Sequence, residues 1–306
     1  MSADQLTEGA ETATLTLNNA AASNFVVVND TSVFTPNLIS GLQLWLDASD
    51  SSTIFDATAG GNLVTTDGSA VARWADKSGN NRHATQTTAN ARPLLMTGGN
   101  GINSKSILSF DGTNDFFTSS VTGFKNLSAV SIIGVVSTPV AAVADGFTMT
   151  LFSFGNAGSA GSGFPDSKSL ILASATGGLN GEKITILCEK SGINSGRLGS
   201  TTYNRTANAA QALQLEVGSS GTQLYANNAS VNLNLSNQIS TSTNLAPNQI
   251  GYTLDDNIQI GALRAGGSLV TFGNQKIAEF LVFNRKLTTE ERDTLWSYLQ
   301  TKWNIA

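Results

Sequence analysis

The chain contains a single cysteine, Cys188, and a single histidine, His83, among its 306 residues. One cysteine excludes an intramolecular disulfide, and the two residues together cannot form a zinc site of the usual Cys/His type. A Ser-His-Asp triad would have to use His83, and a Cys-His dyad would need both residues side by side. We therefore interpret His83 as a packed or surface histidine and Cys188 as a small buried residue.

Charged side chains are also scarce, at 13% of the chain, against roughly a quarter in an average soluble protein. The formal net charge is −5 and the sequence has no basic run. Binding to nucleic acid or to an anionic membrane is therefore not expected. Serine, threonine, asparagine, glycine and alanine are abundant instead, a composition common in β-proteins that function outside cells or in particles.

The sequence indicates neither a signal peptide nor a transmembrane segment. The first ten residues lack both a basic and an apolar region. No apolar run approaches the roughly 20 residues that span a bilayer. We expect a protein made in a cytoplasm that stays there or leaves by another route, such as release inside a virus particle.

The most sharply patterned stretch is residues 276–303. Alternating apolar residues from 277 to 283 predict a strand that is buried on both faces. Thr288 and Glu291 have the spacing of a capping box, which predicts the start of a helix. The helix carries an apolar stripe at i, i+4 and i+8, formed by Leu295, Leu299 and Trp303.

Short strand patterns separated by Gly, Asn and Ser turns run through the chain from residue 38. They predict an all-β fold, an antiparallel β-sandwich closed by a short C-terminal amphipathic helix. Long surface loops are expected at 155–168, 191–209 and 244–257. The strands are predicted at 38–47, 71–76, 93–96, 106–110, 131–136, 149–154, 170–172, 183–187, 212–217, 223–226, 258–260, 269–272 and 277–283.

Residues 1–36 form a β-rich N-terminal arm in this interpretation, ahead of a main domain at 37–306. The arm has strand patterns at 12–17 and 25–28, which are too little chain for a stable domain. These strands need a partner, either the main domain or another subunit. We expect a homo-oligomer in which the arm mediates assembly.

Four motifs that occur in order carry a family resemblance: LWLDAS at 44–49, VARWADKSGN at 71–80, LSFDGTNDF at 108–116, and IAEFLVFNRKLTTEER at 277–292. Together they resemble the laminin-G-like, concanavalin-A-like jelly-roll domains of bacterial surface proteins and phage virion proteins. The resemblance spans 42–303, implies a jelly roll, and leaves out the arm. It is not specific for function, because this sandwich hosts lectins, glycosidases, adhesion modules and structural proteins.

Glycoside hydrolysis, which some proteins of this fold perform, needs two carboxylates about 5–10 Å apart. The resemblance implies that they stand close together on one strand, as in Glu-x-Asp-x-Glu, and this sequence has no such run. Glu279 is alone on its strand, although carboxylates from separate strands could still meet. We therefore expect a protein that is not an enzyme.

Two acidic turns offer oxygen ligands of the kind that Ca²⁺ prefers. Calcium at a rim loop is also implied by the resemblance, so calcium is the one candidate cofactor. The favoured interpretation is structural, with carboxylates that form Asx-turns to nearby backbone amides. The candidate ligands are Asp76 and Asn80 in the first turn and Asp111, Asn114 and Asp115 in the second.

Aromatic side chains are the candidate glycan-binding residues, because their faces stack on pyranose rings. Trp45 and Trp74 lie within strand patterns, where core packing is favoured. Two loop-rich stretches are better candidates for a binding rim. The predicted rim residues are Tyr203, Asn204, Arg205, Tyr252, Asp255 and Asp256.

These observations favour a bacteriophage virion structural protein of the head-decoration, head-fibre or tail-fibre type. It would lie at the virion surface, contact other virion proteins through the arm, and expose its jelly roll to host or environmental glycans. A bacterial surface lectin or adhesin is the first alternative, and a glycan-active hydrolase is the second. Neither nucleic acid nor membrane insertion is expected.

Overall fold

A computed structural model describes residues 33–120, 129–139, 149–156, 168–174, 184–190, 193–200, 203, 207–218, 221–235, 257–265 and 268–305. The predicted arm strands at 12–17 and 25–28 lie outside these residues, as do most of the loops predicted at 155–168 and 244–257. The side chain of Cys188 is also outside the described part of the chain. Within that part, no helix is long and apolar enough to cross a membrane.

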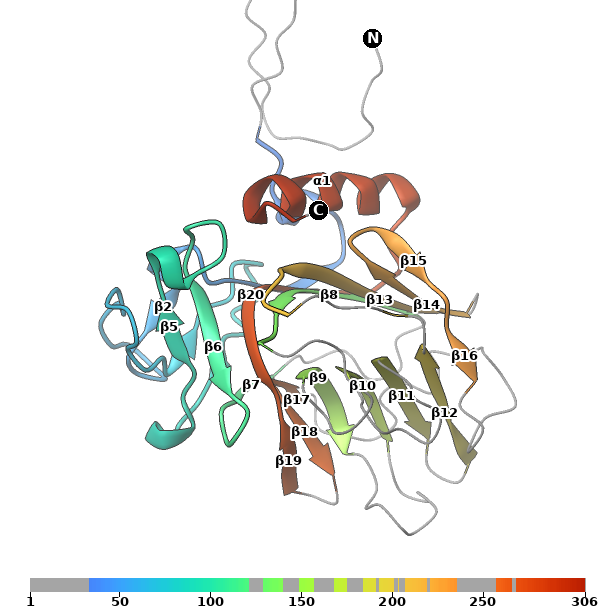
Figure 1. The fold of residues 1–306 in the computed structure, drawn as a ribbon, viewed down its shortest axis with the longest axis horizontal. Coiled ribbons are helices and arrows are strands. Elements are labelled where there is room, and N and C mark those ends of the chain that lie inside the picture. The colour runs from blue at the N-terminus through green and yellow to red at the C-terminus, as the bar shows by residue number, and fades with distance from the viewer. Residues whose placement is uncertain are drawn as a thin grey trace, which may run out of the picture.

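The first layer of the fold is an eight-stranded antiparallel sheet (Figure 1). Its strand order is β15-β14-β13-β8-β20-β6-β5, and β1 also pairs with β20. The central strand β20 is buried from Ile277 to Phe283, as predicted for a strand covered on both faces. The strands are β1 (Leu42–Asp47), β5 (Leu94–Met96), β6 (Ile107–Asp111), β8 (Ala129–Ser137), β13 (Gln211–Gly218), β14 (Gly221–Ala226), β15 (Ala229–Val231) and β20 (Asn274–Phe283).

The second layer is a ten-stranded antiparallel sheet in the order β16-β12-β11-β10-β9-β17-β7-β4-β3-β2. A separate hairpin is formed by β18 (Ala262–Ala265) and β19 (Ser268–Phe272). The strands of the second sheet are β2 (Ile54–Phe55), β3 (Arg73–Trp74), β4 (Ala84–Thr85), β7 (Phe117–Ser120), β9 (Met149–Asn156), β10 (Lys168–Ser174), β11 (Ile184–Lys190), β12 (Ile193–Ser200), β16 (Asn234–Leu235) and β17 (Asn257–Ile260).

The main hydrophobic core lies between the two sheets. Phe280 of the first sheet packs edge-on against Phe152 of the second, with 6.1 Å between ring centroids. Phe110 and Phe117 make a similar pair at 6.1 Å. Edge-to-face contacts of this kind are typical of well-packed aromatic cores. The prediction of an antiparallel β-sandwich is therefore confirmed.

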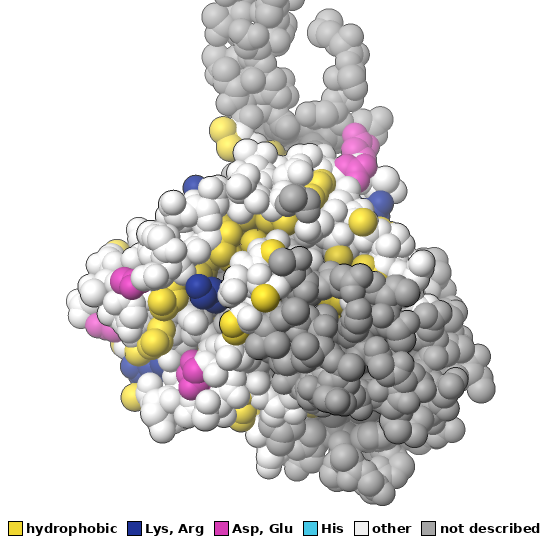
Figure 2. Space-filling view, viewed as in Figure 1, with side chains coloured by type: hydrophobic (Ala, Val, Ile, Leu, Met, Phe, Trp, Pro, Cys, Tyr) yellow, Lys and Arg dark blue, Asp and Glu magenta, His cyan; other side chains and the backbone are white. Residues whose placement is uncertain are grey.

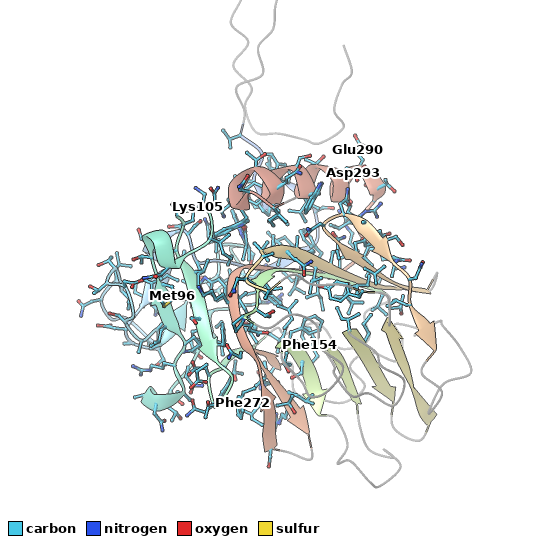
Figure 3. All side chains as sticks on the ribbon, viewed as in Figure 1. Met96, Lys105, Phe154, Phe272, Glu290 and Asp293 are labelled. Atoms are coloured by element: carbon cyan, nitrogen blue, oxygen red, sulfur yellow. The ribbon has the colours of Figure 1, made fainter. Side chains whose placement is uncertain are left out.

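Helix α1 (Thr289–Trp303) covers the outer face of the eight-stranded sheet (Figure 1). The predicted capping box is present, because Glu291 N donates to Thr288 Oγ1 and Thr288 N donates to a Glu291 carboxylate oxygen. Figure 3 shows Glu290 on the side of the helix turned away from the sheets, whereas Asp293 accepts a hydrogen bond from Asn228 Nδ2, in the turn between β14 and β15, at 3.0 Å. The opposite side forms a second core with the sheet through the buried residues Leu295, Leu299 and Trp303.

The loop predicted at 191–209 is wrong in part, because the structure places strand β12 within it. β12 pairs with β11 along most of its length and with β16 on its other side. Its glycines, Gly196 and Gly199, hid the strand pattern, since glycine carries no side chain to alternate between faces. The strand predicted at 71–76 is also shorter, reduced to Arg73–Trp74.

Candidate functional site

A row of polar side chains crosses the outer face of the ten-stranded sheet. On β17, Ile258 and Ile260 enter the core, so the alternation of a strand turns Gln259 to the opposite face. Gln259 stands opposite Thr118 of β7 on one side and Ser153 of β9 on the other. Three neighbouring strands therefore place a hydroxyl, an amide and a hydroxyl side by side on this face.

The β18–β19 hairpin forms a wall beside this row. Gly261, at the end of β17, has φ +91°, and a Cβ on it would lie 2.5 Å from a ring carbon of Phe110. Only glycine fits this turn without strain. Ser153 Oγ then holds the base of the hairpin, since it donates to the carbonyl of Ala262 at 2.9 Å and accepts from Arg264 N at 3.3 Å.

A groove lies between the polar row and the hairpin, with a volume of about 340 Å³. This volume falls in the range of small-molecule sites, roughly 300–1,000 Å³. Arg264 and Leu269 are direct cross-strand neighbours in the hairpin. Among the described residues that line the groove, no carboxylate occurs; they are Thr118, Asn257, Gln259, Arg264 and Leu269.

Gln259 is the residue of the groove that most needs explanation. Its side chain is only 4% exposed, and its Oε1 atom has no hydrogen-bond partner within the described part of the chain. A buried acceptor without a partner costs about 1–3 kcal/mol. An acceptor of this kind in the lining of a groove is suited to a ligand that donates a hydrogen bond.

The structure places Tyr203 in the core instead of on an exposed rim. Its ring is 5% exposed and belongs to the core between the sheets, and its hydroxyl hydrogen-bonds Gln211 Oε1 at 2.8 Å. The other predicted rim residues lie outside the described residues, so their part in binding stays a prediction: Asn204, Arg205, Tyr252, Asp255 and Asp256.

The first predicted calcium turn is occupied by internal hydrogen bonds. The Asp76 carboxylate accepts from the backbone amides of Trp45, Ser78 and Arg82 at 2.8–3.0 Å. Asn80 Nδ2 donates to backbone carbonyls of β1. These bonds are those of an Asx-turn that ties the loop to β1, the structural role favoured from the sequence.

The second predicted calcium turn has the same character. Asp111 Oδ1 accepts from the amides of Thr113 and Asn114, and Asp115 Oδ2 accepts from Asp111 N at 3.0 Å. Burial, with a smaller contribution from the charge of Asp111, raises the pKa of Asp115 to about 6. No group of three or more His, Cys, Asp or Glu side chains suited to a metal is found among the described residues. Calcium binding by either turn stays a prediction.

His83 and the two strand tryptophans have structural surroundings. His83 Nδ1 accepts a hydrogen bond from Asp76 N at 3.0 Å, which helps to fix the first acidic turn. Trp74 is fully buried between the sheets. Trp45 is buried against α1, and its indole nitrogen donates to Glu279 at 2.7 Å. The preference for core packing of both tryptophans over a sugar platform is confirmed.

Glu279 has a carboxylate neighbour from a separate strand, which the sequence left open as a possibility. Asp47, the last residue of β1, stands directly opposite Glu279 of β20. Both side chains are buried, and Lys302 of α1 contacts both, at 2.8 Å from Asp47 Oδ2 and 3.0 Å from Glu279 Oε2. The sequence could not predict this pair, because the two residues belong to strands that are distant in the chain and that only the fold brings together.

Four donors surround the Glu279 carboxylate: Trp45 Nε1, the Tyr298 hydroxyl, Lys302 Nζ and Trp303 Nε1. Burial raises the pKa of Glu279, and Asp47 adds to this effect, while Lys302 opposes it. Burial also acts to raise the pKa of Asp47, but Lys302, Ser49 and Lys77 outweigh it and the pKa is lowered. The two carboxylates therefore differ in their tendency to hold a proton.

The sequence matches no protein-family model, and no curated protein matches it. Among solved structures, it is similar to a sialidase from Trypanosoma rangeli in complex with 2,3-difluorosialic acid, at 16% identity and a TM-score of 0.46 over 95% of this chain and 37% of the sialidase. It is also similar to the binding domain of botulinum neurotoxin serotype D, at 12% identity and a TM-score of 0.47 over 84% of this chain and 52% of that domain. The chain thus spans about a third to a half of their length. At these TM-scores, the ligands and activities of those proteins do not bear on this one.

Proposed function

We propose that this protein is a non-enzymatic carbohydrate-binding protein and that the groove between β17, β7 and the β18–β19 hairpin binds the glycan. The observation that carries the proposal is that Gln259 lines the groove and that its buried Oε1 atom has no hydrogen-bond partner among the described residues. A sugar hydroxyl donates the hydrogen bond that this atom lacks. Binding would then remove the free-energy cost of a buried acceptor that has no hydrogen bond.

The chemistry of the groove supports recognition. Amide, hydroxyl and guanidinium groups offer both donors and acceptors to sugar hydroxyls, and Leu269 offers an apolar contact to the carbon face of a ring. The described lining supplies no general acid or nucleophile for glycoside hydrolysis. The buried pair Asp47 and Glu279 is enclosed by donors from the protein itself. These features favour binding over turnover.

Binding to a glycan array, followed by calorimetry on the strongest ligand, tests the proposal. We expect Gln259→Ala and Asn257→Ala to weaken binding. Arg264→Ala should also weaken binding. Its matched control is Lys105→Ala, which removes a positive charge outside the groove lining (Figure 3). Absence of any glycan ligand, or equal affinity of the wild type and Gln259→Ala, would contradict the proposal. Release of reducing sugar from a bound glycan would favour the hydrolase alternative.

A finer proposal concerns where the protein is located: we propose that it is a bacteriophage virion surface protein, and the alternative is a bacterial surface lectin or adhesin. Its support is the sparse charge, the absence of a disulfide and the resemblance to jelly-roll domains of virion proteins. The part of the described surface that is visible in Figure 2 carries few charged side chains, in line with the composition. Neighbouring portal, capsid or tail genes would favour the virion, and their absence the adhesin.

The arm is proposed to join this protein to neighbouring subunits. The described chain begins at Val33, which is 81% exposed, and Phe34 packs against Tyr298 of α1 with 5.7 Å between ring centroids. Deletion of residues 1–32 therefore leaves this anchor intact. We expect the truncated protein to fold but to lose assembly, measured by light scattering. An unchanged oligomeric state and unchanged attachment would show that the arm has no such role.

A further inference from the structure

Lys302, Asp47 and Glu279 form a buried group of reactive side chains that the proposed function does not use. Lys302 Nζ lies 2.8 Å from Asp47 Oδ2, 3.0 Å from Glu279 Oε2 and 2.9 Å from the Tyr298 hydroxyl. Glu279 is fully buried and Asp47 is 3% exposed. An amine, a carboxyl group and a second carboxylate are therefore held in contact, away from bulk water.

We propose that this group forms an amide cross-link between Lys302 Nζ and Asp47 Cγ, with Glu279 as the catalytic proton carrier. Glu279 accepts a proton from the Lys302 ammonium, and the free amine attacks Asp47 Cγ to give a tetrahedral intermediate. The nitrogen loses a second proton to the departing oxygen, Glu279 returns the first, and one water leaves. An ammonium and a carboxylate thus become an amide and water, with no other reactant.

The surroundings of Asp47 suit this reaction. Its Oδ1 atom accepts from Ser49 N at 3.1 Å and from Ser49 Oγ at 2.6 Å, so donors are in place for the negative charge of a tetrahedral intermediate. Its Oδ2 atom, the departing oxygen, faces the two lysine ammonium groups. Close and fixed contact replaces the collision of separate reactants, which greatly increases the rate of such condensations.

Burial supplies the driving force. Charged groups enclosed away from water are costly even when paired. Amide formation removes one positive and one negative charge from the interior, and the departing water enters the solvent. The bond would also join α1 covalently to β1, which the sequence separates by most of the length of the chain.

Lys302 is the nucleophile in this assignment, although Lys77 also contacts Asp47, at 3.0 Å. Lys77 is paired with Asp50 at 2.8 Å, and its side chain is 24% exposed against 14% for Lys302. Among the described residues, Lys302 is the lysine that contacts Glu279, the proton acceptor. Lys77 therefore provides a matched control within the same site.

Intact mass spectrometry of the full chain tests the proposal. We expect a mass about 18 Da below the sequence mass, the loss of one water, once processing of the first residue is accounted for. Trypsin does not cut after an acylated lysine, so digestion should yield the peptide with Asp47 joined to residues 293–306. A folded wild-type protein that keeps its full sequence mass after prolonged incubation overturns the proposal.

Three variants assign the roles. Glu279→Gln and Lys302→Arg should both keep the full sequence mass, whereas Lys77→Arg should still lose one water. Lys302→Arg preserves the positive charge, so a folded Lys302→Arg protein without the mass loss separates bond formation from folding. Loss of water in Lys302→Arg would assign the bond to Lys77 and overturn our assignment, and loss of water in folded Glu279→Gln would overturn the role of Glu279.

Discussion

Asp47 and Glu279 face each other across β1 and β20, so the fold buries two carboxylates as direct cross-strand neighbours. Like charges in this arrangement repel, and Lys302 is the cation in contact with both. Helix α1 thus contributes a charge to the sheet that it covers, in addition to its apolar stripe. Its docking depends on electrostatics as well as on hydrophobic burial.

The first prediction concerns this cation. Lys302→Met removes the positive charge beside the fully buried Glu279, whereas Asp47 keeps its contact with Lys77, so we expect a loss of about 3–5 kcal/mol in the free energy of unfolding. Loss of an amide bond to Asp47 would enlarge this effect. Chemical denaturation measures it. Lys77→Met is the control and should cost less than about 1 kcal/mol, because its ion pairs are partly exposed; equal losses would contradict the prediction.

The second prediction separates binding from stability at Gln259. Gln259→Met keeps the length of the side chain and removes the unpartnered carbonyl, so stability should rise by about 1 kcal/mol. Glycan affinity should fall by about tenfold or more, because the acceptor is lost. Denaturation and calorimetry on the same preparation measure both quantities. A fall in both stability and affinity would indicate a structural role for Gln259 instead.

The third prediction tests the turn that positions the hairpin. Gly261→Ala introduces a methyl group at positive φ, close to the ring of Phe110, and should lower stability by about 2–3 kcal/mol. Gly79→Ala is the control, because Gly79 also has positive φ but has open space around it, and it should cost about 1 kcal/mol. Similar costs for both would show that the contact with Phe110 is unimportant.

The fourth prediction is a pH dependence. The pKa of Asp115 is raised from 3.8 to about 6, so between these values the folded state binds a proton that the unfolded state does not. Its contribution to stability is therefore present at low pH and is lost as the pH rises, by about 2–3 kcal/mol from about pH 4 to pH 6. Denaturation of Asp115→Asn across this range should show a flatter profile than the wild type. Parallel profiles would contradict the prediction.

Much of the fold could be predicted from local pattern. The capping box of Thr288 and Glu291, the stripe that ends at Trp303 and the doubly buried strand β20 each depend on neighbouring residues, so their periodicity is visible in the sequence. β12 was missed because its glycines interrupt the side-chain alternation; it forms a hairpin with β11, which precedes it directly, and its other neighbour, β16, is more distant in the chain.

Much less of the candidate sites could be predicted from the sequence. Gln259 is one polar residue between two isoleucines, and nothing local shows that Thr118, Ser153 and the hairpin enclose it. Tyr203 carried the chemistry expected of a sugar-binding rim, but burial depends on what packs over a residue, and the core covers it. For the two acidic turns, the sequence favoured a structural role as Asx-turns, and their hydrogen bonds agree with that role.

The sequence by itself determined the class of this protein: a weakly charged, antiparallel β-sandwich that ends in one amphipathic helix. Those properties follow from composition and from periodicities of two and 3.6 residues, which are local. Only the tertiary structure decided that Asp47 meets Glu279 and Lys302, and that Gln259 lines a groove with an Oε1 atom that has no hydrogen-bond partner in the described part of the chain. These contacts depend on strand order and register, which bring together residues that are far apart in the sequence. No local sequence pattern reveals them.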